Sequence, residues 1–534
     1  MKCANLFDII IYLPIDIVQW MWYTIFEENY AHGGDGVKLT GRTVIYANTE
    51  KITAANVIDV LQSALKVHAK NSREIDYLYN YYKGDQPILH RVKEIRPEIC
   101  NMIVENRASE IVAFKTGYLI GEPIQYVVQG ADERFAAGVT QLNEYMSYED
   151  KESVDKELVD WMHIAGTGFR IILPDAYAQH KEDEAPFEIY ALDPRNTFVV
   201  YSTKLGHRPL MGVTVVDTPI DTGVFGQTQT LYGVYTDNWY YEISTVDNGT
   251  TYKIAKAVPQ MLGIPIVEYP LNLARIGAFE IVISLLDAIN LTESDRVDGV
   301  DQFIQALLLF HNVQIDDEEF KKLKAEGAIA FKDIDPQTKA EITYLSEQLD
   351  QGQTQTLVDH MYQTVLTICG MPNRNGGSST SDTGSAVILR DGWNAAEARA
   401  KDTELMFKKS EKSTLKLAIK ICRYLANMNL KVSGVEIRFT RRNYENITQK
   451  VDVLDKMLNN PKIAPRLAFS YCGMFSDPNL AYEESKKHYE EEQKRLEEKE
   501  AAANEANNAP AGDGSGNQQN PDDGQGMRDS GQGR

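Results

Sequence analysis

The stretch MPNRNGGSSTSDTGS, residues 371–385, separates two long segments of strong helical periodicity. It is polar and rich in glycine and serine, and it contains no Val, Ile, Leu or aromatic residue. A loop of this length within an array of long helices is uncommon unless it is functional or is a plain flexible connection. Composition alone leaves both interpretations open.

Long helices are expected on both sides of this loop. Residues 277–311 and 346–370 precede it and flank a charged insert at 312–345, and residues 386–427 follow it. In the last helix the apolar residues recur at near 3.5-residue spacing, and Gly392 is a natural place for a bend. We interpret these helices as a scaffold that presents the loop. The first helix has one apolar and one polar stripe, and the polar stripe comprises Glu280, Asp287, Ser294, Asp298, Asp301 and Gln305.

The residues before this scaffold are predicted to form a mixed α+β body. From Gly168 onward, β-branched and aromatic residues alternate with polar ones in short runs, which favours an antiparallel meander or a small barrel. Its strands are expected at 169–173, 187–192, 197–201, 212–216, 229–235, 239–244 and 252–257. The preceding pattern predicts helices at 54–70, 101–115, 131–148 and 151–165, a Tyr-rich helical turn at 77–89 and an extended stretch at 118–128.

Short elements and a charged helix are expected after the long helices. A strand at 435–440 and a helix at 447–458 precede a short helix within 461–477 and a strongly charged helix at 481–500. Residues 501–534 contain no aromatic residue and no Val, Ile or Leu. Such a tail cannot offset the entropy of ordering, so we predict that it is disordered.

Composition limits the classes of function. A chain of 534 residues suggests two to four packed regions. Its formal net charge of −22 has the wrong sign for a protein that grips phosphates through basic patches. A nucleic-acid partner would therefore be passed along rather than held. The five cysteines are scattered without a CxxC pair, which indicates a reducing compartment and argues against a cysteine-based zinc site.

The N-terminal residues 6–26 are apolar and aromatic, which raises the question of a membrane anchor. Asp8, Pro14 and Asp16 interrupt the run, and Glu27 follows it in place of a basic flank. The longest apolar piece is far below the ~20 residues that a spanning helix needs. We interpret the segment as one that packs or docks on protein, and expect no membrane partner; a peripheral membrane anchor is the alternative.

The sequence contains no recognisable catalytic motif. P-loop, GxSxG, HExxH and EF-hand patterns are all absent, so we predict that the chain is not an enzyme and needs no cofactor or metal. The acidic run at 316–319 precedes several lysines. This arrangement favours a solvated helix start, where acidic side chains suit the helix dipole, over a metal site.

Three segments resemble signatures of a known family. They are YYKGDQPIL at 81–89, the 106–123 element that ends GYLIGEP, and FTRRN at 439–443. Together with the order of the helices, they are similar to portal proteins of tailed bacteriophages of the siphophage type. The resemblance covers roughly residues 70–500. It implies a mainly helical α+β portal-type fold. An N-terminal extension of unknown role (1–50) is followed by a wing (51–276), stem helix 1 (277–311), a clip (312–345) and stem helix 2 (346–370). A tunnel loop (371–385), a long helix returning to the wing (386–440), a helical crown (441–500) and the tail (501–534) come next.

The resemblance also implies a role in the virion. Portal proteins form a ring, generally of twelve subunits, at one capsid vertex, and double-stranded DNA passes through it during packaging and ejection. The terminase large subunit, a motor ATPase, docks on the clip and is later replaced by a head-tail connector, while major capsid and scaffolding proteins contact the ring, which assembles in the host cytoplasm. The implied tunnel-loop residues are Asn373, Arg374, Asn375, Gly376, Gly377, Ser378, Ser379, Thr380, Ser381 and Asp382, and the implied docking residues of the clip are Asp316, Asp317, Glu318, Glu319, Lys321, Lys322 and Lys324.

An acidic helical scaffold or interaction protein of the cytoplasm is the alternative function. It explains the long helices and the acidic composition, but not the β-rich region at 168–270.

Overall fold

The chain forms two compact units that divide after Asn446, and each is described by itself. The computed structural model describes residues 41–129, 133–175, 184–219, 228–246, 251–304, 307–311, 313–314, 318, 332–333, 341–345, 351–373, 392–440, 447–475 and 478–507. The expected mixed α+β class is confirmed by these elements.

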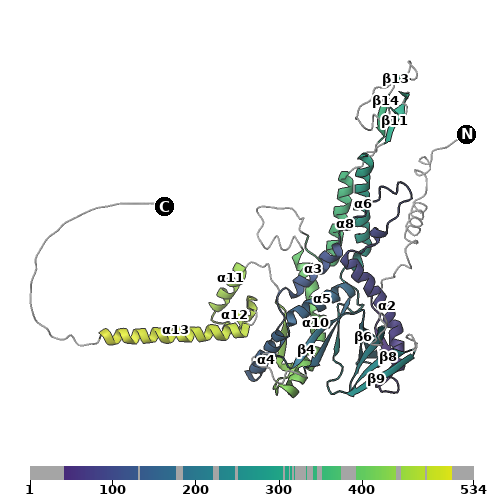
Figure 1. Ribbon diagram of the computed structural model, residues 1–534. Helices are drawn as coiled ribbons and strands as arrows, with labels where there is room; N and C mark the ends of the chain where they lie inside the picture. Colours follow the sequence, from purple (N-terminus) through teal and green to yellow (C-terminus); the bar gives the residue numbers. More distant parts are fainter. Residues whose placement is uncertain are drawn as a thin grey trace, which may run out of the picture. The chain divides into compact units, whose positions relative to one another are not determined.

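The first unit begins with two helices that frame an irregular loop (Figure 1). Helix α2 (Val57–Lys83) merges the helix expected at 54–70 with the Tyr-rich turn that follows it, because buried residues recur along its whole length. Helix α3 (Arg107–Ile120) starts six residues later than expected and ends five residues later, at Ile120. Asn106 caps it by accepting a hydrogen bond from the backbone N–H of Ser109.

The late start of α3 has a tertiary cause. The backbone N–H groups of Asn101, Ile103 and Glu105 donate hydrogen bonds to side chains of a distant helix rather than to carbonyls of their own turn. A pattern that looks helical in isolation is therefore held in a non-helical conformation. The stretch expected to be extended at 118–128 is correspondingly helical up to Ile120 and becomes strand β2 only over Gln125–Val128.

Two sheets replace the single meander or barrel that the alternation predicted. Strands β5 to β9 form the antiparallel meander, with β1 (Ile45–Ala47) added in parallel beside β5. Strands β3 and β4 belong to a second sheet because β10 (Ile266–Pro270), which the pattern did not single out, pairs with β3. The other bounds are β3 Thr167–Pro174, β4 Phe187–Leu192, β5 Thr197–Ser202, β6 Pro209–Pro219, β7 Thr228–Thr236, β8 Trp239–Val246 and β9 Thr251–Pro259.

Helices cover both sheets. Val57, Leu61 and Ala64 of α2 pack into the core of the larger sheet. Helices α4 (Ala136–Tyr148) and α5 (Lys151–Ala165) lie where they were expected, except that a short 3-10 turn, η4 (Glu133–Phe135), precedes α4. Helix α5 packs along the smaller sheet.

Helix α6 (Ile283–Ile304) is shorter than the helix expected over 277–311. A 3-10 turn, η6 (Glu280–Val282), precedes it, and strand β11 (Leu307–His311) follows it. The apolar run at the end of the expected helix pairs antiparallel with β14 (Glu341–Leu345), Leu307 opposite Leu345. A short apolar run does not distinguish strand from buried helix by periodicity, which explains the error.

The chain returns along α6 as helix α8 (Gln351–Cys369). Between the two helices, β11 and β14 form one strand pair, and β12 (Val313–Gln314) and β13 (Lys332–Asp333) form a second. Figure 1 shows α6 and α8 side by side, extending from the sheets, with β11 and β14 beyond their far ends.

The described part of the long helix, α10 (Trp393–Leu425), starts directly after Gly392. Gly392 is the N-cap residue, with a φ of 82° in the left-handed region, which favours glycine. The residues expected to start this helix, 386–391, lie outside the described residues. After α10, the turn η7 (Val432–Gly434) leads into β15 (Val435–Arg438), which pairs with β2.

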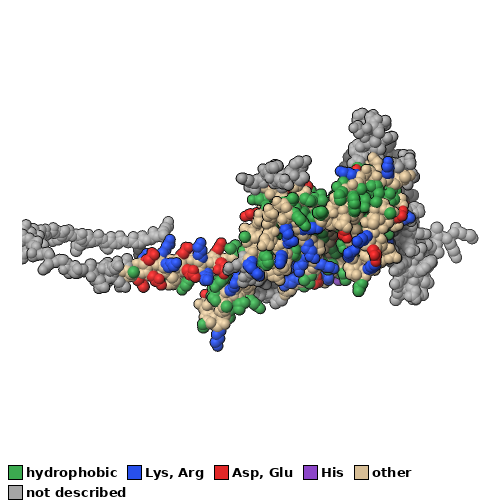
Figure 2. Space-filling view, turned by 90° about the horizontal axis from the view of Figure 1, so that it is seen from below, with side chains coloured by type: hydrophobic (Ala, Val, Ile, Leu, Met, Phe, Trp, Pro, Cys, Tyr) green, Lys and Arg blue, Asp and Glu red, His purple; other side chains and the backbone are tan. Residues whose placement is uncertain are grey.

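The second unit consists of α11 (Ile447–Leu458), α12 (Pro465–Tyr471) and α13 (Pro478–Asn507). Acidic and basic side chains alternate along the surface of α13 (Figure 2). The prediction of disorder from residue 501 is wrong for 501–507, because Ala501 to Ala503 are strong helix formers that prolong α13. The remainder of the expected tail lies outside the described residues.

Candidate functional site

The helices α6 and α8 form a hairpin whose base is embedded in the first unit. Leu286 and Ile289 of α6 and Val365 of α8 belong to one buried core with Tyr81 of α2 and Val112 of α3. The hydroxyl of Tyr81 also donates a hydrogen bond of 2.8 Å to Asp287. Burial raises the pKa of Asp287 to about 6, although this bond acts in the opposite direction. The hairpin is therefore fixed at its base by packing.

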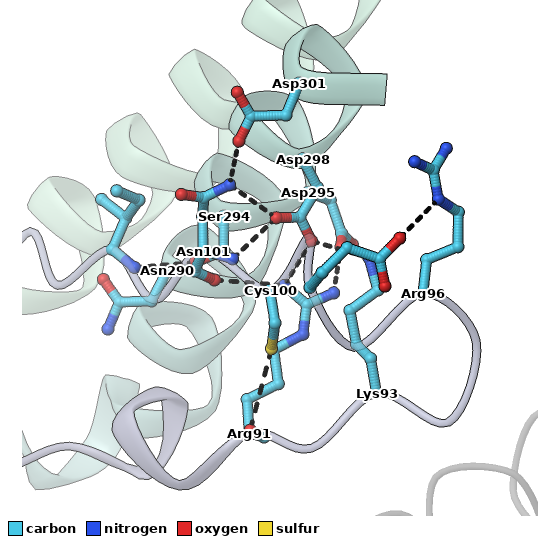
Figure 3. A network of polar contacts seen from close by, with 12 residues as sticks. Arg91, Lys93, Arg96, Cys100, Asn101, Asn290, Ser294, Asp295, Asp298 and Asp301 are labelled. Carbon is cyan, nitrogen blue, oxygen red and sulfur yellow. Dashed lines mark hydrogen bonds and ion pairs between the residues drawn. The ribbon is translucent and has the colours of Figure 1, made fainter. Parts of the chain in front are cut away.

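The polar stripe of α6 faces the loop between α2 and α3 rather than water (Figure 3). Asp298, almost fully buried, accepts hydrogen bonds from the backbone N–H of Asn101 at 2.7 Å and from Nζ of Lys93 at 2.8 Å. Nη1 of Arg91 lies 3.2 Å from the same carboxylate. Burial opposes ionisation of Asp298, but the bonds from Lys93 and Asn101 outweigh it and lower its pKa.

Ser294 of this stripe and the neighbouring Asn290 extend the attachment toward the base of the hairpin. The hydroxyl of Ser294 accepts a hydrogen bond of 2.9 Å from the backbone N–H of Ile103. The side-chain oxygen of Asn290 accepts one of 3.0 Å from the backbone N–H of Glu105. Asn290 and Ser294 are both buried. Helix α6 thus carries a ladder of acceptors that supports the loop leading into α3.

The residues on either side of the 374–391 segment meet at one point. A Cβ atom on Gly392 would lie 3.9 Å from the carbonyl oxygen of Met371 and from the Cα of Pro372. Met371 is buried, and its backbone N–H donates to the carbonyl of Leu366. The segment therefore leaves and rejoins the body at the same place, between the end of α8 and the start of α10.

The start of α10 is attached to α3. The ring of Trp393 lies 6.0 Å from that of Tyr118, and the hydroxyl of Tyr118 donates to Glu397 at 3.0 Å. Lys115 of α3 donates to the carbonyl of Cys369 at the end of α8. Helix α3 thus positions both helices that border the segment.

A second charged cluster attaches the middle of α10 to the body. Glu411 accepts from Nη1 of Arg170 on β3 at 2.8 Å and from the hydroxyl of Tyr269 on β10 at 2.6 Å. Nζ of Lys151 on α5 lies 3.3 Å from Glu411 and 2.5 Å from Asp155, which also pairs with Arg170. All of these side chains are buried.

The charges in this cluster support one another. Burial alone would raise the pKa of Glu411, but Lys151 and Arg170 outweigh it and lower the pKa to about 2. Burial raises the pKa of Tyr126 and Tyr269 well above the usual value, and the neighbouring Glu411 raises it further. Both phenol hydroxyls therefore stay protonated and neutral, and can donate hydrogen bonds. Sequence reasoning missed this cluster. The sequence does carry one signal for it. Glu411 stands four residues from Phe407 and four residues from Leu415, so a carboxylate falls on the apolar stripe of α10.

The comparison with known families decides the class of this chain. The model of a family described as phage portal protein, SPP1 Gp6-like, matches residues 62–506. The chain belongs to this family. The resemblance seen in the segments at 81–89, 106–123 and 439–443 is thereby confirmed. A search of curated proteins finds no match.

Membership gives this portal protein a general role. Portal proteins are structural rather than enzymatic, and the family implies a ring of subunits at a capsid vertex through which DNA passes.

Within the described ranges, every helix is too short or too polar to span a lipid bilayer. The same residues hold no group of three or more His, Cys, Asp or Glu side chains placed to bind a metal ion. The apolar segment at 6–26 lies outside the described residues.

Most of the residues that the portal resemblance singled out are not described. Of the tunnel-loop residues, Asn373 is half-buried beside the end of α8, and Arg374 to Asp382 lie outside the described part. Of the named clip residues, Glu318 is exposed, and the others lie outside the described part of the chain. The described structure therefore places the points of attachment of both regions, but not the regions themselves.

Proposed function

We propose that this portal protein forms the DNA channel at one capsid vertex, used for packaging and for ejection, with the 371–385 loop lining it. Twelve subunits form the ring, as is general in the family that the match over 62–506 identifies. The single observation that favours the loop is that the described residues on either side of 374–391 lie next to each other. Because Gly392 lies beside Met371 and Pro372, the whole 374–391 segment can extend into a channel without separating α8 from α10.

The composition suits passage rather than retention. A ring of subunits with a net charge of −22 each creates a negative field, and a wall that repels phosphate avoids tight, salt-dependent binding. The charge is unevenly distributed, since the underside in Figure 2 carries many Lys and Arg side chains. We therefore assign the channel to a more acidic or neutral face than this one.

The far end of the hairpin is the proposed docking platform. The described clip residues include β12, β13 and β14, and β14 pairs with β11, which follows α6. We assign docking of the terminase large subunit, and later of the head-tail connector, to this end. Contact with major capsid and scaffolding proteins is assigned to the wing, which comprises the body at 51–276.

Shortening the loop tests its role. Deletion of residues 376–383 leaves both attachment points and the described helices in place. We expect rings with an unchanged number of subunits by native mass spectrometry, and a loss of DNA filling in a packaging assay. Unchanged filling by intact rings would remove the loop from the mechanism. A wild-type chain that forms only dimers or trimers would instead favour an acidic scaffold protein.

A further inference from the structure

The loop between α2 and α3 presents two apolar side chains to solvent. Val92 is 85% exposed and Ile95 is 81% exposed, while Ile99 a few residues later is only 2% exposed. An isolated exposed apolar side chain needs no explanation, but two such side chains at the tip of one loop form a small apolar patch. We call residues 91–101 the strap loop.

The strap loop is held in one conformation. Asp298 ties Arg91 and Lys93 at its start to Asn101 at its end, as Figure 3 shows. At the turn, Arg96 has a φ of 53°, a left-handed conformation that is unusual outside glycine, and its carbonyl accepts from the N–H of Ile99 at 3.0 Å. A frayed loop would not keep an almost fully buried carboxylate and a left-handed turn. Val92 and Ile95 are therefore presented by a preorganised element.

A second apolar stripe lies on the other helix of the hairpin. On α8, Leu357 is 50% exposed and Ile368 is 38% exposed, eleven positions apart and so on the same side of the helix. Both Asp298 on α6 and Leu357 on α8 stand six residues from the ends of their helices nearest β11 and β14 (304 − 298 and 357 − 351). Leu357 and the attachment of the strap loop at Asp298 thus lie at a similar height on the antiparallel hairpin, and Ile368 lies about 16 Å nearer its base.

A ring requires two different, complementary faces on each subunit, because its interfaces are heterologous. The strap loop is attached to α6, and in Figure 1 it lies on the side of α6 away from α8. The stripe belongs to α8. A ring in which the α6 side of one hairpin meets the α8 side of the next would cover both exposed apolar surfaces.

We propose that the strap loop is a subunit–subunit contact, in which Val92 and Ile95 pack on the Leu357–Ile368 stripe of a second copy of this chain. The inference rests on the proposed ring and assigns to it a particular pair of surfaces. It explains why the polar stripe of α6 is used to fix a loop instead of facing water.

Photocrosslinking of the full-length chain tests the pairing directly. With p-benzoylphenylalanine in place of Ile95, irradiated rings should give inter-chain products that map by mass spectrometry to α8. The same probe in place of Leu205, which is fully exposed in the turn before β6, is the matched control and should not crosslink to α8. Intact rings whose Ile95 products lie within one chain, for example on residues 6–26, would overturn the pairing but leave the ring standing. A wild-type chain without rings would overturn both proposals.

Removal of the apolar tip tests its contribution. In the double variant V92S/I95S we expect the concentration needed for half-maximal ring assembly to rise about tenfold or more, since two apolar side chains are no longer buried. The melting temperature of the monomer should not change, because both side chains are already exposed there. The L205S variant should assemble like the wild type. Assembly of V92S/I95S at the wild-type concentration would refute the contact.

Discussion

Two carboxylates on long helices, Asp298 of α6 and Glu411 of α10, receive cations from distant parts of the chain in different settings. Glu411 and its partners Arg170 and Lys151 are buried almost completely. Around Asp298, the cations Arg91 and Lys93 keep part of their side chains in solvent. The cluster around Glu411 is therefore part of the core, whereas the cluster around Asp298 fixes the conformation of a surface loop.

The largest expected effect is at Glu411. Glu411→Ala would leave Arg170 and Lys151 buried with Asp155 as their only remaining carboxylate, and loss of one partner from a buried pair costs roughly 3–5 kcal/mol. We expect a large fall in the free energy of unfolding of the first unit, measured by chemical denaturation. Glu411→Gln keeps the size of the side chain and separates charge from packing. A wild-type unfolding curve for Glu411→Ala would contradict the assignment of this cluster to the core.

The pH dependence of this cluster follows from the lowered pKa of Glu411. A carboxyl whose pKa is lowered by folding contributes stability above its ordinary value of 4.5, and loses that contribution as the pH falls toward its folded value of about 2. The difference in unfolding free energy between the wild type and Glu411→Gln should therefore be largest near neutral pH and shrink below the ordinary carboxyl value. A difference that stays constant through this window would show that Glu411 acts through packing alone.

A smaller effect is expected at Asp298. Asp298→Asn keeps the shape of the side chain but weakens its bonds to Lys93 and Arg91, which water partly compensates, so the cost should be about 1–2 kcal/mol. Hydrogen exchange at the backbone N–H of Asn101 should become faster, while exchange in α10 stays unchanged. Equal destabilisation by the variants at Asp298 and Glu411 would remove the distinction between the two clusters.

The smallest effect is expected on α13. Lys486 and Glu490 are one helical turn apart, with both side chains more than half exposed and 3.9 Å between their charged atoms. Exposed pairs of this kind contribute little to stability. Lys486→Ala should leave the melting temperature of the chain unchanged within error, and a clear fall would show that exposure is a poor guide to the value of ion pairs in this protein.

Local patterns predicted several elements well. Helices α5 and α11 and strand β4 have the bounds expected from periodicity and flanking residues, because their apolar faces repeat within the element itself. The family was also accessible from short segments such as that at 81–89, and the match over 62–506 confirms it. The candidate site could be predicted only as an order of regions, since only Asn373 and Glu318 among its named residues are described.

Residue patterns were sufficient to predict the α+β class, the succession of long helices and the family. Long-range contacts were needed to make Leu307 to His311 a strand, to keep Asn101 to Glu105 out of helix α3, and to bury Asp298 and Glu411. The reason is physical: periodicity reports which side of an element is apolar, but the partner of a strand or a buried carboxylate is supplied by residues far away in the chain.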